Sequence, residues 1–146
     1  MGSMNRQKMI VGGIVAGVIL IVLDYVSGTF VFTPMAAGTP GSMSAALTAV
    51  MSSKRAMVGG FITDLLYGIT IVWCYAAIRP RYGAGSKTGM CAAAFVWFVS
   101  VLAYATFYLD RMMSLQFFCI VALAELISML IAGYVGCMMY SEGGAS

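Results

Sequence analysis

The sequence contains no histidine, and only 9% of its 146 residues are charged. Without histidine, a serine–histidine–aspartate triad, bis-histidine haem ligation and histidine-rich metal sites are all excluded. The four cysteines show no C-x-x-C spacing and are too few and too scattered for a disulfide scaffold. A soluble domain carries roughly 25% charged residues, so the composition argues against an ordinary globular protein. We expect no cofactor and no metal, and nothing positive argues for an enzyme, although two carboxyl groups suffice for acid–base chemistry.

Apolar residues make up 62% of the chain and gather in four long runs. A helix that crosses a bilayer needs about 20 mostly apolar residues, so each run is long enough for one span. We predict spans at residues 9–32, 56–78, 88–109 and 115–140. Because these spans leave no room for a soluble domain, we predict one all-α transmembrane domain over residues 4–146, folded as an antiparallel four-helix bundle.

The start of the chain has two features that bear on this reading. Residues 1–3, a Met-Gly-Ser sequence before the second methionine at Met4, look like a remnant of cloning, so we take Met4 as the native start. The first apolar run is longer than the roughly 7–15 residues of a signal-peptide core, and it contains Asp24. We therefore expect this run to be kept as the first transmembrane helix rather than cleaved.

The connections between the spans differ in length. Short connections make the second, third and fourth spans antiparallel neighbours. The second span is predicted to end before Arg79, Pro80 and Arg81, because proline lacks an amide N–H and restricts the residue before it. The first loop, residues 33–55, is longer, and its second half has apolar residues at helical spacing (positions 43, 47, 50 and 51). Residues 42–53 are therefore predicted to form a short helix at the membrane surface, with a loop as the alternative.

The basic residues lie almost entirely at the ends of the spans. Five fall on the side of the termini and three on the other side, namely Arg6, Lys8, Arg79, Arg81 and Lys87 against Lys54, Arg55 and Arg111. Short loops rich in lysine and arginine are usually cytoplasmic, so both termini are predicted to lie in the cytoplasm. Basic residues at span ends contact lipid headgroups, which makes the lipid bilayer the expected partner and argues against nucleic acid.

Three acids, Asp24, Asp64 and Glu125, fall inside the predicted spans. Each would cost roughly 2.5–3.5 kcal/mol at the centre of a spanning helix on the insertion scale, so such residues are candidates for a functional site. Counted from the side opposite the termini, all three lie at a depth of roughly 10–15 Å, which predicts one shared layer. Small residues on the same helix faces predict close helix packing beside the acids. These packing residues are Gly13, Gly17, Gly60, Gly68, Ala132 and Gly136.

Hydroxyl groups are available near the acids to complete a polar site. The candidates are Tyr25, Thr63, Tyr67, Ser100 and Tyr104. Acids with aromatic neighbours suit a proton, a small cation or a cationic organic molecule held by carboxylates and ring faces. The alternative is structural: each acid is protonated and hydrogen-bonded across helices, and binds nothing. A second functional hypothesis is a non-catalytic structural or accessory subunit that forms homo-oligomers, or binds lipid or a partner protein, through its glycine-rich faces.

Two segments resemble a known family. Residues 11–17 (VGGIVAG) and residues 72–83 (VWCYAAIRPRYG), the latter continuing through Gly85, Lys87 and Thr88, resemble an uncharacterised family of small bacterial inner-membrane proteins with four spans. The resemblance implies a multi-pass location in a bacterial inner membrane and no particular activity. The four-span size is also similar to that of small multidrug-resistance transporters, which use a membrane-embedded acid in the first span. Asp24 lies late in its span, and no other motif of that family is present.

Overall fold

The computed structural model describes residues 5–39 and 41–140, and four helices in this part of the chain are long and apolar enough to cross a membrane. The described residues contain no strand. The all-helical prediction and its four long apolar helices are therefore confirmed, whereas the cloning remnant at residues 1–3 and the start at Met4 lie outside the described residues. The elements are α1 (Arg6–Ser27), the π-helix η1 (Gly28–Phe32), α2 (Thr33–Gly38), α3 (Ala45–Met51), α4 (Lys54–Tyr82), α5 (Ser86–Leu109) and α6 (Leu115–Met138).

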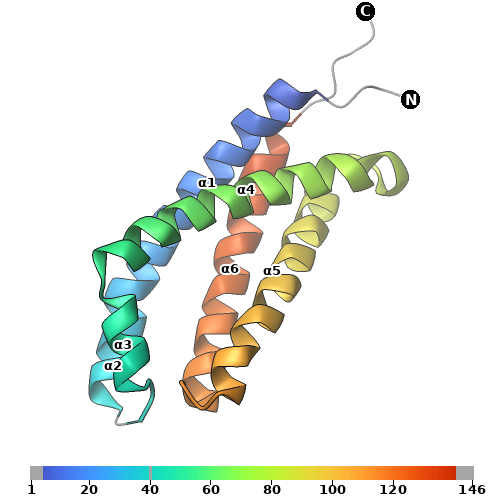
Figure 1. Ribbon diagram of the computed structural model, residues 1–146. Coiled ribbons are helices and arrows are strands. Elements are labelled where there is room, and N and C mark those ends of the chain that lie inside the picture. The colour runs from blue at the N-terminus through green and yellow to red at the C-terminus, as the bar shows by residue number, and fades with distance from the viewer. Residues whose placement is uncertain (1–4, 40, 141–146) are drawn as a thin grey trace, which may run out of the picture.

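Successive long helices run in opposite directions, and α1 begins at the end of the molecule where α6 finishes (Figure 1). We call this the terminal end, and the end that holds α3 and the α5–α6 loop the opposite end. α1 packs against α4 and α6, and α5 packs against the same two helices. In Figure 1, α4 crosses α6 at a steep angle, whereas α5 and α6 lie side by side along most of their length.

Glycine allows the backbones of α1 and α4 to touch. A Cβ atom added at Gly68 of α4 would overlap the Gly13 carbonyl oxygen and the Gly17 backbone nitrogen of α1. A Cβ at Gly13 or Gly17 would in turn lie 2.6–2.7 Å from a Cα atom of α4. Gly136 of α6 approaches α1 in the same way. Without a hydrophobic force between helices in lipid, such close packing holds them together.

Two helices are longer than predicted, because neither proline ends its helix. The first helix continues without a break from Arg6 to Gly38, so the prediction of a loop starting at residue 33 was wrong. Pro34 lies in the first turn of α2, directly after the π-helical turn, where the missing N–H costs little. The predicted end of the second span before Pro80 was also wrong. Pro80 lies within the last turn of α4, and the helix continues to Tyr82 and is capped by Gly83 (φ 86°).

A short helix does form within residues 42–53. α3 begins after Ser44, whose side-chain oxygen accepts a hydrogen bond from the Leu47 N–H (3.2 Å). Its predicted apolar stripe is only partly buried, since Leu47 is buried but Val50 and Met51 are exposed. The position of α3 at a membrane surface stays a prediction.

The chain just before α3 pairs with the α5–α6 loop and closes the opposite end of the molecule. Met43 and Met113 form an isolated antiparallel bridge. The Ser44 N–H donates to the Met112 carbonyl (2.8 Å), and the Ser114 N–H donates to the Ser42 carbonyl (2.9 Å). This pairing, which we call the clasp, joins the first half of the chain to the second.

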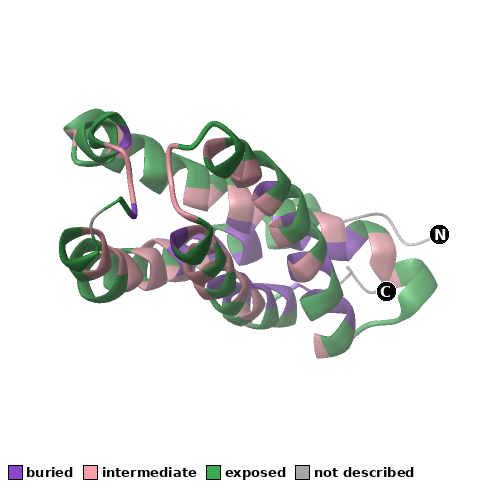
Figure 2. Ribbon diagram, turned by 90° about the horizontal axis from the view of Figure 1, so that it is seen from below, coloured by how far each residue is buried: buried purple, intermediate pink, exposed green. Residues whose placement is uncertain are grey.

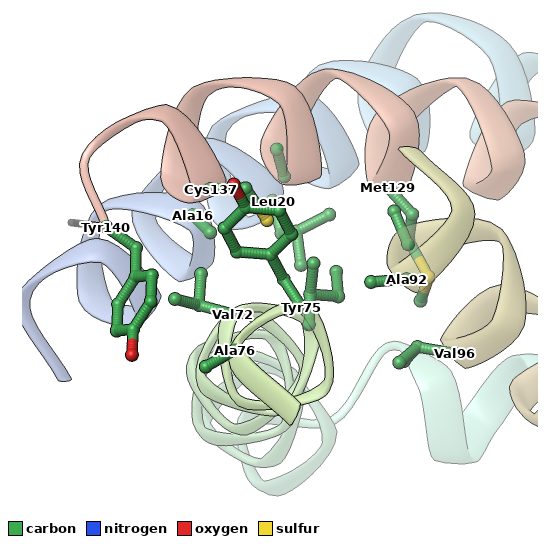
Figure 3. Packing of buried hydrophobic residues seen from close by; sticks show 13 residues of the cluster. Ala16, Leu20, Val72, Tyr75, Ala76, Ala92, Val96, Met129, Cys137 and Tyr140 are labelled. Atoms are coloured by element: carbon green, nitrogen blue, oxygen red, sulfur yellow. The ribbon is translucent and has the colours of Figure 1, made fainter. Parts of the chain in front are cut away.

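The buried residues lie on the faces that the long helices turn toward one another, and most of the outer surface is exposed apolar side chains (Figure 2). The apolar core draws on all four long helices (Figure 3). By their positions in these helices, its residues lie toward the terminal end. Leu20 comes one turn before Asp24, and Met129 comes one turn after Glu125, so the core ends where the half-buried acids begin. The core residues are Ala16, Leu20, Ile71, Val72, Tyr75, Ala76, Ala92, Ala93, Val96, Met129, Ala132, Cys137 and Tyr140.

Candidate functional site

Asp24 of α1, Asp64 of α4 and Glu125 of α6 lie close together beside the apolar core, and all three are half-buried. The carboxyl group of Asp24 forms side-chain hydrogen bonds with Glu125 and Ser128. Asp64 is close enough to Asp24 and Glu125 for their charges to interact. We call these three residues the acidic cluster. That the cluster binds a proton or another ligand stays a prediction.

The contact between Asp24 and Glu125 has a chemical requirement. Ionised carboxylates only accept hydrogen bonds, so two carboxyl groups that share one need a proton on one of them. Ser128 donates to the same carboxyl group and thereby fixes its position. No lysine or arginine occurs in residues 9–53, 56–78 or 112–140, the stretches that contain the three acids. The contacts of the Asp24 carboxyl group are therefore with a hydroxyl group and a second carboxyl group, and no basic side chain in these stretches supplies a countercharge.

Hydroxyl groups from α4 and α5 complete the surroundings of the acids. Tyr67 forms a side-chain hydrogen bond with Ser100, whose own hydroxyl donates to the Trp97 carbonyl oxygen (2.8 Å). Tyr104 lies near all three acids. Two of the five predicted hydroxyl residues, Tyr67 and Tyr104, thus lie near the acidic cluster, and Ser100 is linked to it through Tyr67.

The other two predicted hydroxyl residues lie outside it. The Tyr25 side chain is 65% exposed, and Thr63 is exposed with its hydroxyl donating to the Gly59 carbonyl oxygen (2.8 Å). Each is the immediate sequence neighbour of an acid, and consecutive residues lie about 100° apart around a helix. The side chains of Tyr25 and Thr63 therefore point away from the helix faces that carry Asp24 and Asp64.

Two further residues, Ser128 and Trp97, contribute to the site although they were not among the predicted site residues. Ser128 lies three residues after Glu125, and this spacing indicates that the two share a face of α6. The indole N–H of Trp97 donates to the Ala122 carbonyl oxygen (2.8 Å), which joins α5 to α6 about one turn before Glu125. A sequence contains no sign of that second contact, because it depends on how two helices are rotated against each other.

Of the predicted packing residues, all but one are buried between helices. Gly13, Gly17, Gly68, Ala132 and Gly136 are buried. Gly60 is exposed, with nothing within 4 Å of an added Cβ atom. It precedes Asp64 by one turn, in the half of α4 that leads away from the core.

The acids are not arranged as ligands of a metal ion. Within residues 5–39 and 41–140, no group of three or more cysteine, aspartate or glutamate side chains could hold one. A pocket at the corner between α3 and α4 includes Ser53 and Arg55 but none of the three acids. The acidic cluster thus offers carboxyl and hydroxyl oxygens, with a shared hydrogen bond at its centre.

Comparisons of the chain with family models, with curated proteins and with solved structures give no match in any of the three. The resemblance carried by residues 11–17 and 72–83 therefore stays an expectation, and so does the bacterial inner membrane that it implies.

Proposed function

We propose that this chain is a small integral membrane protein whose acidic cluster binds a proton and exchanges it with solvent. The observation that carries the proposal is the hydrogen bond between Asp24 and Glu125, on facing helices of a chain whose long apolar helices suit a membrane. Asp64 adds a third carboxyl group nearby. Intramembrane acids are costly and usually face a functional interior, which supports this assignment.

A proton suits this geometry better than a metal ion does. The described acids do not form a metal-binding group, whereas the shared hydrogen bond already has the stoichiometry of one proton for two carboxyl groups. When the pair loses its proton, a small organic cation could replace it, with Tyr67 and Tyr104 offering ring faces.

We further propose that both termini lie in the cytoplasm, at the inner membrane of a bacterium. The support is the excess of basic residues at the terminal end, five against three, together with the family resemblance. Fusing a reporter that is active on only one side of the membrane to the C-terminus tests the orientation. Activity of a periplasm-specific reporter at that position would contradict it.

The proton site is tested by infrared difference spectroscopy of the purified chain, which detects the C=O stretch of a protonated carboxyl group. We expect such a band, with a shift in deuterated water, in the wild type and its loss in both D24N and E125Q. The matched control is D110N, which neutralises an exposed acid in the α5–α6 loop and should leave the band unchanged. A wild type without the band, or a band that survives both substitutions, would show that the proposal is wrong.

Transport is tested separately in liposomes that contain a trapped pH indicator. The variant with all three acids replaced, D24N/D64N/E125Q, should lose any proton flux that the wild type shows. Equal proton flux in the two proteins would show that the acidic cluster takes no part in proton conduction.

The alternative of an accessory subunit that oligomerises through glycine has one observation in its favour. Most glycines of α1 and α4 are used inside the chain, but Gly59 and Gly60 are exposed with nothing near them. A second helix could approach α4 at this point. Cross-linking of the wild type in a native-like bilayer that disappears in G60L would support this role.

A further inference from the structure

We propose that the corner between α3 and α4 binds an anionic phospholipid. Arg55 and Ser53 hold the phosphate group, and the start of an acyl chain lies on the apolar side chains beside them. This site lies toward the opposite end of the molecule and shares no residue with the acidic cluster. The two proposals share only the premise that the long helices span a membrane, so either one can fail alone.

The corner, where α3 meets the start of α4 (Figure 1), contains an open pocket of about 560 Å³. Its lining has two polar residues, Ser53 and Arg55, and three apolar ones, Ala49, Val50 and Ala56. Ligand pockets typically have volumes of about 300–1,000 Å³ and a mostly apolar lining with a few polar groups. The size and the lining of this pocket therefore suit an amphipathic ligand.

The polar groups of the pocket are free to bind an anion. Arg55 is exposed, and no described residue forms a hydrogen bond, an ion pair or a ring contact with its side chain. Guanidinium groups bind phosphate through two parallel hydrogen bonds. The Ser53 hydroxyl accepts a hydrogen bond from the Ala56 N–H (3.1 Å) and keeps its own proton to donate to a further phosphate oxygen. A phosphate group at the pocket thus finds donors from two neighbouring side chains.

The charge around the pocket also favours an anion. Lys54 directly precedes Arg55 and is exposed as well. No acid occurs in residues 25–63, which form α3, the corner and the start of α4, and Asp64 follows Arg55 by two and a half turns of helix. Asp110, the described acid in the α5–α6 loop, forms no ion pair with either basic residue. Basic residues at the ends of spanning helices attract anionic lipids.

Exposed apolar side chains beside the pocket favour a lipid over a soluble anion. Val50 and Met51 before the corner, and Met57 and Val58 after it, are each more than half exposed. At the surface of a bilayer such side chains contact acyl chains while a neighbouring basic residue contacts phosphate groups. The corner is also where the α4 span begins, and thus where the apolar layer ends. A phospholipid supplies both the phosphate and the acyl chain that this lining suits.

Hydrogen bonds keep the corner in shape. The Ser53 N–H donates to the Val50 carbonyl (3.1 Å), and the Met57 N–H donates to the Ser53 carbonyl (3.1 Å). Ser44, which caps the start of α3, also belongs to the clasp and so ties α3 to the α5–α6 loop. The pocket is therefore preformed, and binding needs no change in the backbone.

The test measures lipid retention by native mass spectrometry of the full chain in detergent, with phosphatidylglycerol and phosphatidylcholine added in equal amounts. We expect the wild type to retain phosphatidylglycerol selectively, because the choline cation of phosphatidylcholine would face Lys54 and Arg55. R55Q should weaken this retention about fivefold, the loss expected for one basic residue near a lipid phosphate. A49F, which fills the pocket without a change of charge, should weaken the retention as well.

Each variant has a matched control. R111Q neutralises another exposed arginine at the same end, and A77F adds the same ring at an exposed alanine near the C-terminal end of α4. Both controls should stay within about twofold of the wild type. Circular dichroism checks the folding of all four variants. If A49F does not fold, R55Q and R55K carry the test, and R55K, which preserves the charge, should retain more lipid than R55Q does.

Four outcomes would overturn the proposal. One is equal retention of the two lipids by the wild type, and another is retention in R55Q and A49F that equals that of their controls. The third is displacement of the lipid by millimolar inorganic phosphate, which would assign the site to a free anion. The fourth is a dimer of the wild type that both R55Q and A49F dissociate, which would assign the corner to a second copy of the chain.

Discussion

Replacing Gly68 by alanine tests whether the contact between α1 and α4 holds the molecule together. An added Cβ atom would lie 2.6 Å from the Gly17 Cα atom and closer still to the Gly13 oxygen, and all these atoms belong to backbone. The two helices must separate by roughly 1 Å to restore ordinary contact, and overpacking of this kind costs about 1–3 kcal/mol. Since backbone cannot rotate away as a side chain can, we expect the overpacking alone to lower the free energy of unfolding of G68A by about 3 kcal/mol.

The control is G60A, in the same helix two turns earlier, where nothing lies within 4 Å of the new Cβ atom. Alanine is preferred over glycine in helices by about 1 kcal/mol, so this variant should be neutral or more stable. Part of this helix-propensity gain also applies to G68A, so the net decrease in its free energy of unfolding is about 2 kcal/mol. The assay is unfolding by sodium dodecyl sulfate in mixed micelles, followed by circular dichroism. If G68A and G60A unfold at the same detergent fraction, the reasoning on the glycine contact is refuted.

Two further variants test contacts at the acidic cluster and at the opposite end. W97F removes the hydrogen bond to the Ala122 carbonyl and should lower the free energy of unfolding by about 1 kcal/mol. The control W73F, which replaces an exposed tryptophan, should leave that free energy unchanged. Equal stability of the two variants would mean that the Trp97 indole N–H contributes nothing. Cysteines placed at Met43 and Met113, in a chain whose four native cysteines are replaced, should form a disulfide that peptide mass spectrometry detects. The backbone hydrogen bonds on either side make Met43 and Met113 a non-hydrogen-bonded antiparallel pair. The Cα atoms of such a pair lie about 4.5 Å apart, within the range that a disulfide spans. Failure to oxidise would show that the clasp is open in solution.

The number of long helices could be predicted because each apolar run exceeds the length needed to cross a bilayer. The starts of α5 and α6 fall within two residues of the predicted spans, since turns with glycine or polar residues precede both. Helix ends at proline were harder to predict. Pro34 lies in the first turn of α2, where a missing N–H is tolerated, whereas α4 continues past Pro80 to Tyr82, and neither outcome is visible before the surrounding turns are known.

The candidate site could be predicted in part for a related reason. Counting residues from one side of the membrane placed Asp24, Asp64 and Glu125 at similar depth, and the structure brings the three into one cluster. The depth of a residue in the membrane, however, does not specify in which direction its side chain points around the helix axis. Thr63 was included because it adjoins Asp64, and a rotation of about 100° per residue moves it to another face. Contacts such as that of Trp97 with α6 depend on helix crossing angles, which no pattern in one helix encodes.

The glycine contact between α1 and α4 makes one point along these helices different from all others. The two backbones are in contact there, so the helices cannot move closer together, and any change of the crossing angle between α4 and α1 must be a rotation about that contact. Displacement in a lever grows with distance from its pivot. The two ends of α4, Lys54 and Tyr82, lie equally far along the helix from Gly68 and therefore sweep the widest arcs for a given tilt, whereas Asp64, one turn from the pivot, travels only a short way.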